Sequence, residues 1–600
     1  MTTSGERSAL DPGLVPVHHR IRDLIAKYPE GPLPEAEVKA ISESARRPFP
    51  GSGDPLSEPS FNDRPDLKTR IERRRAARAF LADIVRPAGS GVAADLERLS
   101  ERLRHNTFRS GRPPALEASD LDLPADRIHT IALHLLRNGV SNAEVLTGLH
   151  LMADIARSDD ADLLRELAML GQDLGYYAVR ALGRLPGSAP HLLKVAERTP
   201  RRDRTTVVEG LAGQPDADIE ALLGSLSPKQ TASLAEMLLC LPGTPRRLIG
   251  HQGFAKVVKV LAETPRDLSR HPAVLVTIAR VWDEVRYGRF ALLGFAPGER
   301  EATAESLRML LRAPEVAGDV ERALARHPAS GTLIWVSRQI GRAVLAEPET
   351  MPSGIAVRVI VPDPGNGGDA RTQLLVDGVP LIERLFNQGF GDSPEWMLQR
   401  QGGLRATVEP REVRLAEPDC TEGCCGALRA RIWRDEKAGL VEWEVRHTHR
   451  SKEGPVRFSF DAAAYDTEIA RAASDFTWEW PARRAARLLR ERIMAEPELL
   501  SRWECGLGWV SSWNRERSTV QFYFNYPGRE SEEEKQPWLQ FRYAFEVPDA
   551  VVVDDTAVTA AVERVVADLR SADPKTVKRH SGGSREHAEA LGFPWPPRNR

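Results

Sequence analysis

Apolar residues between positions 126 and 345 recur at the spacing of one helix face, which predicts a series of short helices. Two such stripes flank Gly171: Leu163, Leu164, Leu167 and Leu170 before it, and Ala178, Ala181, Leu182 and Leu185 after it. Prolines end successive units at intervals of 29, 27 and 23 residues: Pro186, Pro215, Pro242 and Pro265. Because a short helical hairpin cannot bury both of its apolar faces alone, neighbouring hairpins must stack. We therefore expect a degenerate α-solenoid.

The predicted stack resembles HEAT and armadillo arrays in architecture, although its period is shorter than theirs. An irregular helical bundle would show the same periodicity and stays open as the alternative. A solenoid leaves a long curved surface, on which another protein or a nucleic acid can bind.

Tryptophan is concentrated in the second half of the chain, which differs in composition from the first half. All 12 tryptophans lie at or after position 282, and ten lie at or after 396. Leu, Ala and Arg favour helices, whereas aromatic and β-branched residues suit strands, so this shift predicts a domain boundary. We place it near residue 350, in EPETMPSG. The predicted organisation is a helical, partly flexible region (1–125), a HEAT-like solenoid (126–350), an α+β domain (351–572) and a partly ordered tail (573–600).

Strand-length apolar or alternating segments follow this boundary. They are GIAVRVIVP, TQLLVDGVPLI, GALRARIWR, GLVEWEVRH, VRFSF, GLGWVSSW, TVQFYFNYP and WLQFRYAFEV. Three helical patterns lie between them: AAAYDTEIARAASD, PARRAARLLRERIMAEPELL and TAVTAAVERVVADLRSA. Because strands and helices do not alternate strictly, we expect an α+β fold with a mainly antiparallel sheet.

The charge and the termini limit the class of partner. The formal charge of −2 gives no global field toward nucleic acid or an anionic membrane. The N-terminus lacks the apolar core of a signal peptide, and we see no apolar run long enough to span a bilayer. Five cysteines, three of them crowded together, are not a disulfide framework. We expect a cytoplasmic protein with reduced thiols.

Two features of the N-terminal region are distinctive. The Pro/Gly/Ser-rich segment 48–66 predicts a flexible linker. The basic run RIERRRAARAF (70–80) is typical of a solvated helix face, and its alternative interpretation is a nucleic-acid contact.

Three of the cysteines lie in DCTEGCCG (419–426), directly before a predicted hairpin. If the apolar faces of its strands coincide, Ile432 lies opposite Val441 and Leu428 opposite Val445. Continued, this register places Cys424 opposite His449, with His447 on the same face. The residues that we expect to gather there are Cys420, Cys424, Cys425, His447 and His449.

Three interpretations of this cluster stay open. Small apolar cysteines pack well at strand edges, so they can be purely structural. Thiolates and imidazoles are also ligands that zinc prefers, which makes zinc the one cofactor that the sequence suggests, although CxxxCC is not a standard spacing. A reactive thiol is the third interpretation. Cys240 and Cys505 lie in apolar contexts and are expected in the core.

Familiar catalytic signatures are absent from the sequence: we find no GxxxxGK[ST], HExxH, GxSxG or kinase set. The glycine-rich PGNGGDA (364–370) is expected to join two strands as a hairpin loop. Glu442, Glu444 and Arg446 fit a solvated strand face, and Trp478 and Trp480 fit a helix start that packs on a sheet.

Four segments together resemble a set of uncharacterised actinobacterial proteins over about residues 370–570. They are LLVDGVPLI, DCTEGCCG with its arginine-rich strand, RFSFDAAAYDTEIARA and DFTWEWPARRAARLL. The resemblance implies a shared C-terminal domain and carries no activity.

These features favour an interaction or scaffold protein: the solenoid binds another protein, and the α+β domain supplies a second recognition surface. An enzyme with a metal or thiolate site near the cysteines is the first alternative. Nucleic-acid binding through a basic helical surface is the second.

Overall fold

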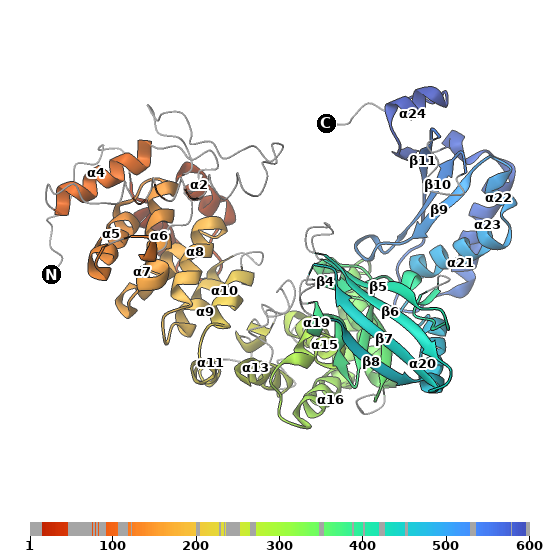
Figure 1. The fold of residues 1–600 in the computed structure, drawn as a ribbon, viewed down its shortest axis with the longest axis horizontal. Helices are drawn as coiled ribbons and strands as arrows, with labels where there is room; N and C mark the ends of the chain where they lie inside the picture. The colour runs from red at the N-terminus through yellow and green to blue at the C-terminus, as the bar shows by residue number, and fades with distance from the viewer. Residues whose placement is uncertain are drawn as a thin grey trace. The chain divides into compact units, whose positions relative to one another are not determined.

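A computed structural model provides the structure of the chain (Figure 1). Apart from a few shorter pieces, it describes residues 15–45, 92–105, 118–121, 123–199, 204–226, 252–263, 272–346, 353–386, 389–399, 403–418, 426–449, 454–528, 536–577 and 579–595. The chain divides into two compact units, residues 1–257 and 258–600. The linker at 48–66, Cys240 and nearly all of the basic run at 70–80 lie outside the described residues.

The described part of unit 1 is helical. Its helices are α1 (Val17–Lys27), α2 (Glu35–Ala45), α4 (Val92–His105), α5 (Ala125–Asn138), α6 (Asn142–Ile155), α7 (Ala161–Ala168), α8 (Gln172–Leu182), α9 (Ala189–Arg198), α10 (Arg204–Leu211) and α11 (Asp216–Leu223). Helix α13 (Gln252–Ala262) contains the division between the units. Both predicted apolar stripes are buried, and the predicted break at Gly171 is confirmed by its φ of 60°.

Helices of unit 1 pack in two interleaved series. Helices α6, α8 and α10 pack in succession, as do α7, α9 and α11, and α5/α6, α7/α8 and α9/α10 also pack as pairs. The N-terminal α1 joins them by packing on α5 and α7, and its Val17 amide donates to the Gly139 carbonyl at 2.9 Å. The predicted region 1–125 therefore does not stand apart from the helices that follow it.

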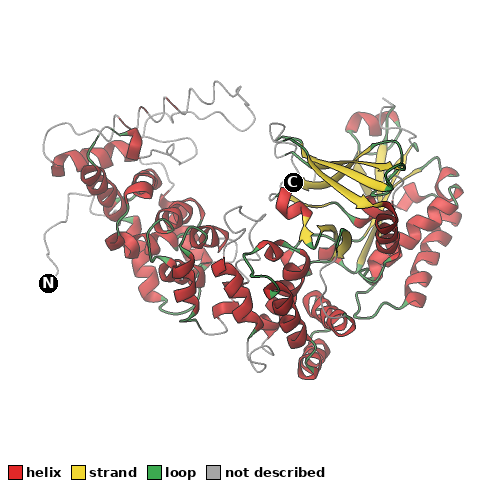
Figure 2. Ribbon diagram, turned by 60° about the horizontal axis from the view of Figure 1, so that its bottom comes forward, coloured by secondary structure: helices red, strands yellow, loops and turns green. Residues whose placement is uncertain are grey.

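Unit 2 contains helices and antiparallel sheets (Figure 2). Its longer helices are α15 (Pro272–Tyr287), α16 (Glu299–Leu311), α17 (Pro314–Arg326), α18 (Gly331–Leu345), α20 (Ala462–Ser474), α21 (Pro481–Ala495) and α23 (Asp555–Ser571). The shorter ones are α19 (Leu381–Leu385), α22 (Glu498–Ser501), α24 (Arg585–Ala590) and a π-helix (Glu395–Gln399). No described helix of the chain has both the length and the apolar character needed to cross a bilayer.

The strands of unit 2 form three sheets. The first has the order β1 (Ile355–Ile360), β2 (Arg371–Val376) and β3 (Val379–Pro380). The second is a meander of β4 (Gly389–Gly391), β5 (Arg411–Pro418), β6 (Leu428–Asp435), β7 (Leu440–His447) and β8 (Val456–Asp461). The third has the order β12 (Arg579–Gly582), β11 (Leu539–Glu546), β10 (Thr519–Tyr526) and β9 (Gly506–Ser511). The expectation of a helical front part followed by mainly antiparallel sheets is confirmed.

Two hydrophobic cores lie in the strand-bearing part of unit 2. The first and second sheets share a core with α20, in which Trp443 and Tyr465 are fully buried. The third sheet packs its apolar face on α21 and α23 around Phe522, Phe524 and Phe541. Because β12 belongs to this sheet, residues after 572 are part of the fold and not only a tail.

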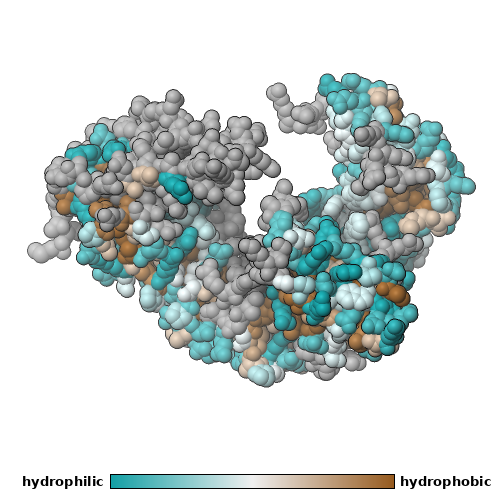
Figure 3. Space-filling view, in the orientation of Figure 1, coloured by the Kyte–Doolittle hydropathy of each residue, from teal (hydrophilic) through white to brown (hydrophobic). Residues whose placement is uncertain are grey.

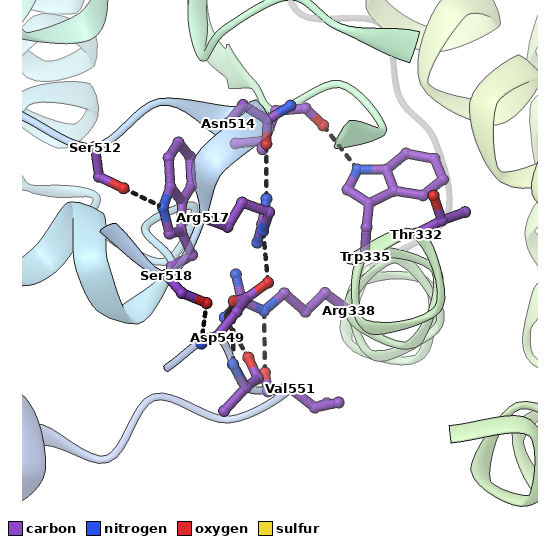
Figure 4. Close-up of polar contacts among 12 residues, drawn as sticks. Thr332, Trp335, Arg338, Ser512, Asn514, Arg517, Ser518, Asp549 and Val551 are labelled. Carbon is purple, nitrogen blue, oxygen red and sulfur yellow. Dashed lines mark hydrogen bonds and ion pairs between the residues drawn. The ribbon is translucent and has the colours of Figure 1, made fainter. Parts of the chain in front are cut away.

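Helix α18 is tied to the loops of the sheets by buried and partly buried polar contacts (Figure 4). Trp335 Nε1 donates to the Val361 carbonyl at 2.8 Å, and Arg338 Nε donates to the Val551 carbonyl at 3.2 Å. Asp549 accepts from Arg517 Nε at 2.7 Å and pairs with Arg338 Nη2 at 3.4 Å. These contacts join helices before residue 350 to strands after it, so the division at 257/258 does not coincide with the predicted boundary near 350.

Candidate ligand-binding face

The predicted cysteine–histidine cluster is described only in part. Cys420, Cys424 and Cys425 lie outside the described residues. His447 and His449 lie together, with ring centroids 6.4 Å apart, and the His449 amide donates to His447 Nδ1 at 3.1 Å. A Cβ on Gly426 would lie 3.0 Å from the His447 ring and 3.1 Å from the His449 ring. The residue that follows Cys425 thus lies against both imidazoles.

The predicted register of this hairpin is wrong by two residues. Ile432 pairs with Trp443, Ala430 with Val445 and Leu428 with His447. The side chains of both strands lie on the predicted faces, but the turn between the strands is not the one that the predicted register requires. Asp435 pairs with Leu440, and Gly439 adopts a φ of +67°. The Asp435 carboxylate accepts the amides of Lys437 and Ala438 at 3.0 and 3.1 Å, which fixes a turn that alternation of side chains cannot reveal.

Other predicted positions are structural. Cys505 is buried, as expected, and burial raises the pKa of its thiol to about 12. Glu442 and Glu444 lie on a solvated face, where they pair with Ser459 and Arg457. Trp480 is fully buried at the start of α21 and donates to Ser512 Oγ at 2.9 Å, which confirms its predicted packing role.

The third sheet has one apolar face, which α21 and α23 cover, and one face of polar and aromatic residues. Val520, Phe522 and Phe524 of β10 point into the core formed with α21 and α23, which Figure 1 draws on one side of the strands. Successive side chains of a strand point to opposite faces. Gln521, Tyr523 and Asn525 therefore lie on the other face. We call this the aromatic face, and its residues are Trp509, Trp513, Gln521, Tyr523, Asn525, Gln540 and Arg542.

A β-bulge places Trp509 on this face. Phe522 pairs with Val510 but Phe524 pairs with Leu507, so two residues of β9 oppose Tyr523 alone. One of the two is Gly508, where a Cβ would lie 2.9 Å from the Tyr523 carbonyl oxygen. Glycine permits this close approach, and the Trp509 ring stacks on the Tyr523 ring with centroids 4.0 Å apart and planes 20° apart.

Gln521 holds two of the aromatic side chains. Its Oε1 accepts from Tyr523 OH at 2.9 Å and from Trp513 Nε1 at 3.3 Å, while its Nε2 donates to Glu516 Oε2 at 2.8 Å. The Trp513 ring meets the Trp509 ring edge-on at 5.8 Å. Gln521 is only 5% exposed, whereas the three rings are partly exposed. The rings are thus positioned before any ligand arrives.

Polar side chains continue the aromatic face across β11. Arg542 lies directly opposite Tyr523, and Gln540 lies opposite Asn525. Gln540 Nε2 donates to Asn525 Oδ1 at 3.5 Å. Within the described part of the chain, the partly exposed Arg542 guanidinium has no hydrogen bond or ion pair. A cation beside stacked rings can bind an anionic group next to a planar one.

Two charged side chains of unit 2 outside this face, Arg483 and Glu479, are already paired. Arg483 of α21 forms a bidentate pair with Glu395 at 2.7 and 2.8 Å and donates to the Ser512 carbonyl at 2.7 Å. Glu479 accepts two bonds from Arg487, while burial raises the pKa of the Glu479 carboxyl. These groups hold α21 and the π-helix in place, so we assign them a structural role.

Sequence reasoning missed the aromatic face, although its signal is present. TVQFYFNYP alternates two kinds of residue, apolar at Val520, Phe522 and Phe524 and polar or aromatic at Gln521, Tyr523 and Asn525. Reading the two faces separately would have marked the second one.

The described residues contain no group of three or more His, Cys, Asp or Glu side chains placed to hold a metal ion. Cys420, Cys424 and Cys425 lie outside those residues. Comparison of the chain with family models, with curated proteins and with solved structures finds no match in any of the three.

Proposed function

We propose that the chain is a cytoplasmic interaction protein, whose helical unit binds a partner protein and whose aromatic face is a second recognition surface. The observation that carries the proposal is the aromatic face: three partly exposed rings, two of them fixed by a buried glutamine, and one of them, Tyr523, opposite Arg542, which has no ion pair among the described residues. Partly exposed rings held rigidly lose little entropy on binding, which is why such residues dominate recognition surfaces.

The interleaved packing in unit 1 supports a solenoid of the HEAT type. In that arrangement each helix contacts its pair mate and its counterparts in neighbouring pairs, as α6, α8 and α10 do. A hollow lined by Gly171, Tyr176, Val195 and Thr206 lies among α8, α9 and α10, and Tyr176 is 40% exposed there. Hydrophilic residues cover much of the visible surface of both units (Figure 3).

Site-specific photocrosslinking in the native cell tests the proposal. A benzophenone side chain is introduced at Tyr176 or at Asn525, with Ser459, an exposed strand position outside the aromatic face, as the matched control. The expected result is a discrete adduct from each probe and none from the control. The Asn525 adduct must also disappear when Trp509 is replaced by alanine. Products identical to those of the Ser459 control would contradict the proposal.

A further inference from the structure

Three neighbouring strands carry a row of side chains whose chemistry changes from one end to the other. Trp509 on β9 stacks on Tyr523 of β10, and Arg542 of β11 is the direct cross-strand neighbour of Tyr523. Neighbouring strands lie about 4.8 Å apart, so the two rings and the Arg542 guanidinium follow each other at short, regular intervals.

The cationic end of the row is Arg542 of β11, which lacks an internal counter-charge among the described residues. A nearby carboxylate would normally offset the charge of such an arginine. Arg542 has no such partner among the described residues, although Arg517 and Arg483 in the same part of unit 2 are each paired with an acid. An anion bound from outside would supply the missing charge, and a guanidinium fits the oxygens of a phosphate in a bidentate manner.

The other end of the row favours a planar, apolar ring. Trp509 and Tyr523 are held stacked, and Trp513 meets Trp509 edge-on, so further rings can add to this arrangement. The amides of Asn525 and Gln540 flank the row and offer both donors and acceptors to the polar edge of a ring. A ligand that carries planar rings next to an anionic group matches the whole row.

We propose that the aromatic face binds single-stranded nucleic acid, with bases stacking on Trp509 and Tyr523 and a phosphate pairing with Arg542. The inference rests on the proposed function, because it names the ligand class of the second recognition surface. A duplex is excluded as the ligand, since its bases are already stacked and their faces are covered. Recognition led by stacking tolerates many base sequences.

Fluorescence anisotropy with the full chain and a labelled 15-nucleotide oligothymidine or oligouridine tests the inference. Replacing Trp509 or Tyr523 by alanine should weaken binding about 5- to 150-fold, which corresponds to about 1–3 kcal/mol of stacking per base. Trp509→Phe, which keeps a ring, should retain more affinity than Trp509→Ala. Circular dichroism and thermal unfolding establish that each variant is folded.

Arg542→Ala should weaken binding and also reduce the slope of log K against log salt by about 0.7, the value for one phosphate contact on a single strand. Arg542→Lys should keep that slope. Arg446→Ala is the matched control, because Arg446 is an exposed arginine on the outer face of the second sheet. It should leave both the affinity and the slope unchanged.

The inference would be overturned by no binding of either oligonucleotide, by binding that alanine at Trp509, Tyr523 and Arg542 leaves unchanged, or by equal binding of a duplex. Competition by an acidic peptide as strong as that by the oligonucleotide would also overturn it. If oligonucleotides fail but the Asn525 probe still gives a protein adduct that depends on Trp509, the recognition surface stands and only the ligand class is wrong.

Discussion

Arg338 of α18 donates to the carbonyl of Val551, in the segment that follows β11, across 213 residues of sequence. The same guanidinium reaches the Ala550 carbonyl and the Asp549 carboxylate. Arg517 donates to Asp549 from the other side and lies 4.7 Å from the centre of the Trp480 ring. Two arginines thus share one buried carboxylate, which fastens a helix from the front of unit 2 to its last sheet.

Replacing Asp549 by asparagine should therefore lower the free energy of unfolding of unit 2 by about 3 kcal/mol. Both guanidinium groups would stay in a desolvated place without their counter-charge. Urea unfolding followed by tryptophan fluorescence measures the loss. Asp555→Asn is the control, because Asp555 is 74% exposed and pairs with Arg484, so it should cost less than about 1 kcal/mol. Equal losses for the two variants would contradict this assignment.

Glu383 should make the stability of the chain depend on pH. Burial is the main cause that raises the pKa of this carboxyl above its ordinary value of 4.5; nearby Glu284 adds to the rise, and Arg371 and a bond from Gln373 oppose it. The folded state therefore binds the proton more tightly than the unfolded chain does. The stability that the protonated Glu383 carboxyl contributes to the folded state is fully present below pH 4.5. It is lost as the pH rises through the pKa of this carboxyl in the folded state.

Glu383→Gln should consequently be more stable than the wild-type chain at pH 8, and the difference should shrink toward pH 4.5. The introduced amide would still accept the bond from Gln373 Nε2, which is 2.6 Å long in the wild-type chain. Thermal unfolding at a series of pH values provides the measurement, with Glu546→Gln on an exposed strand position as the control. A stability difference between Glu383→Gln and the wild-type chain that does not change with pH would rule out the raised pKa of Glu383 as its cause.

Two glycines should respond in opposite ways to alanine. Gly439 has a φ of +67° and open space around a Cβ, so alanine there introduces backbone strain of about 1 kcal/mol without a clash. Gly341 lies on the exposed side of α18 with nothing within 4 Å of a Cβ, so alanine there should stabilise the helix by up to about 1 kcal/mol. Chemical denaturation of both variants gives the sign of each change in the free energy of unfolding. A change of the same sign in both variants would show that one of these backbone assignments is wrong.

The zinc hypothesis for the cysteine cluster makes a separate prediction. Because His447 Nδ1 accepts the His449 amide, His447 would bind a metal through Nε2. The purified chain should then carry about one equivalent of zinc, and His449→Ala together with Cys424→Ser should remove it. Elemental mass spectrometry decides: well under one equivalent in the wild-type chain leaves the structural and reactive-thiol interpretations.

Local structure was predictable where side-chain pattern determines it. All eight predicted strands and all three later helices are present, because alternation and helical spacing directly report which face is buried. Strand β5 was missed because Arg411, Glu412, Arg414 and Glu417 give it the composition of a loop. The hairpin register failed for a different reason: one turn, fixed by Asp435 and Gly439, displaces all of the pairs.

Contacts between residues far apart in the sequence were harder to predict. Nothing in the sequence near Arg338 indicates that its partners follow β11, so the composition shift near residue 350 suggested a boundary that the polar contacts of α18 bridge. The aromatic face likewise depends on a bulge at Gly508, which brings Trp509 onto Tyr523 and which alternation alone does not predict.

The single amide oxygen of Gln521 makes Trp513 and Tyr523 interdependent. If either ring loses its bond to that oxygen, the oxygen accepts a hydrogen bond from the other ring alone. Substitutions at Trp513 and Tyr523 are therefore expected to have non-additive effects on binding. Retuning this surface for another ligand would then require replacing the glutamine and both rings as one set.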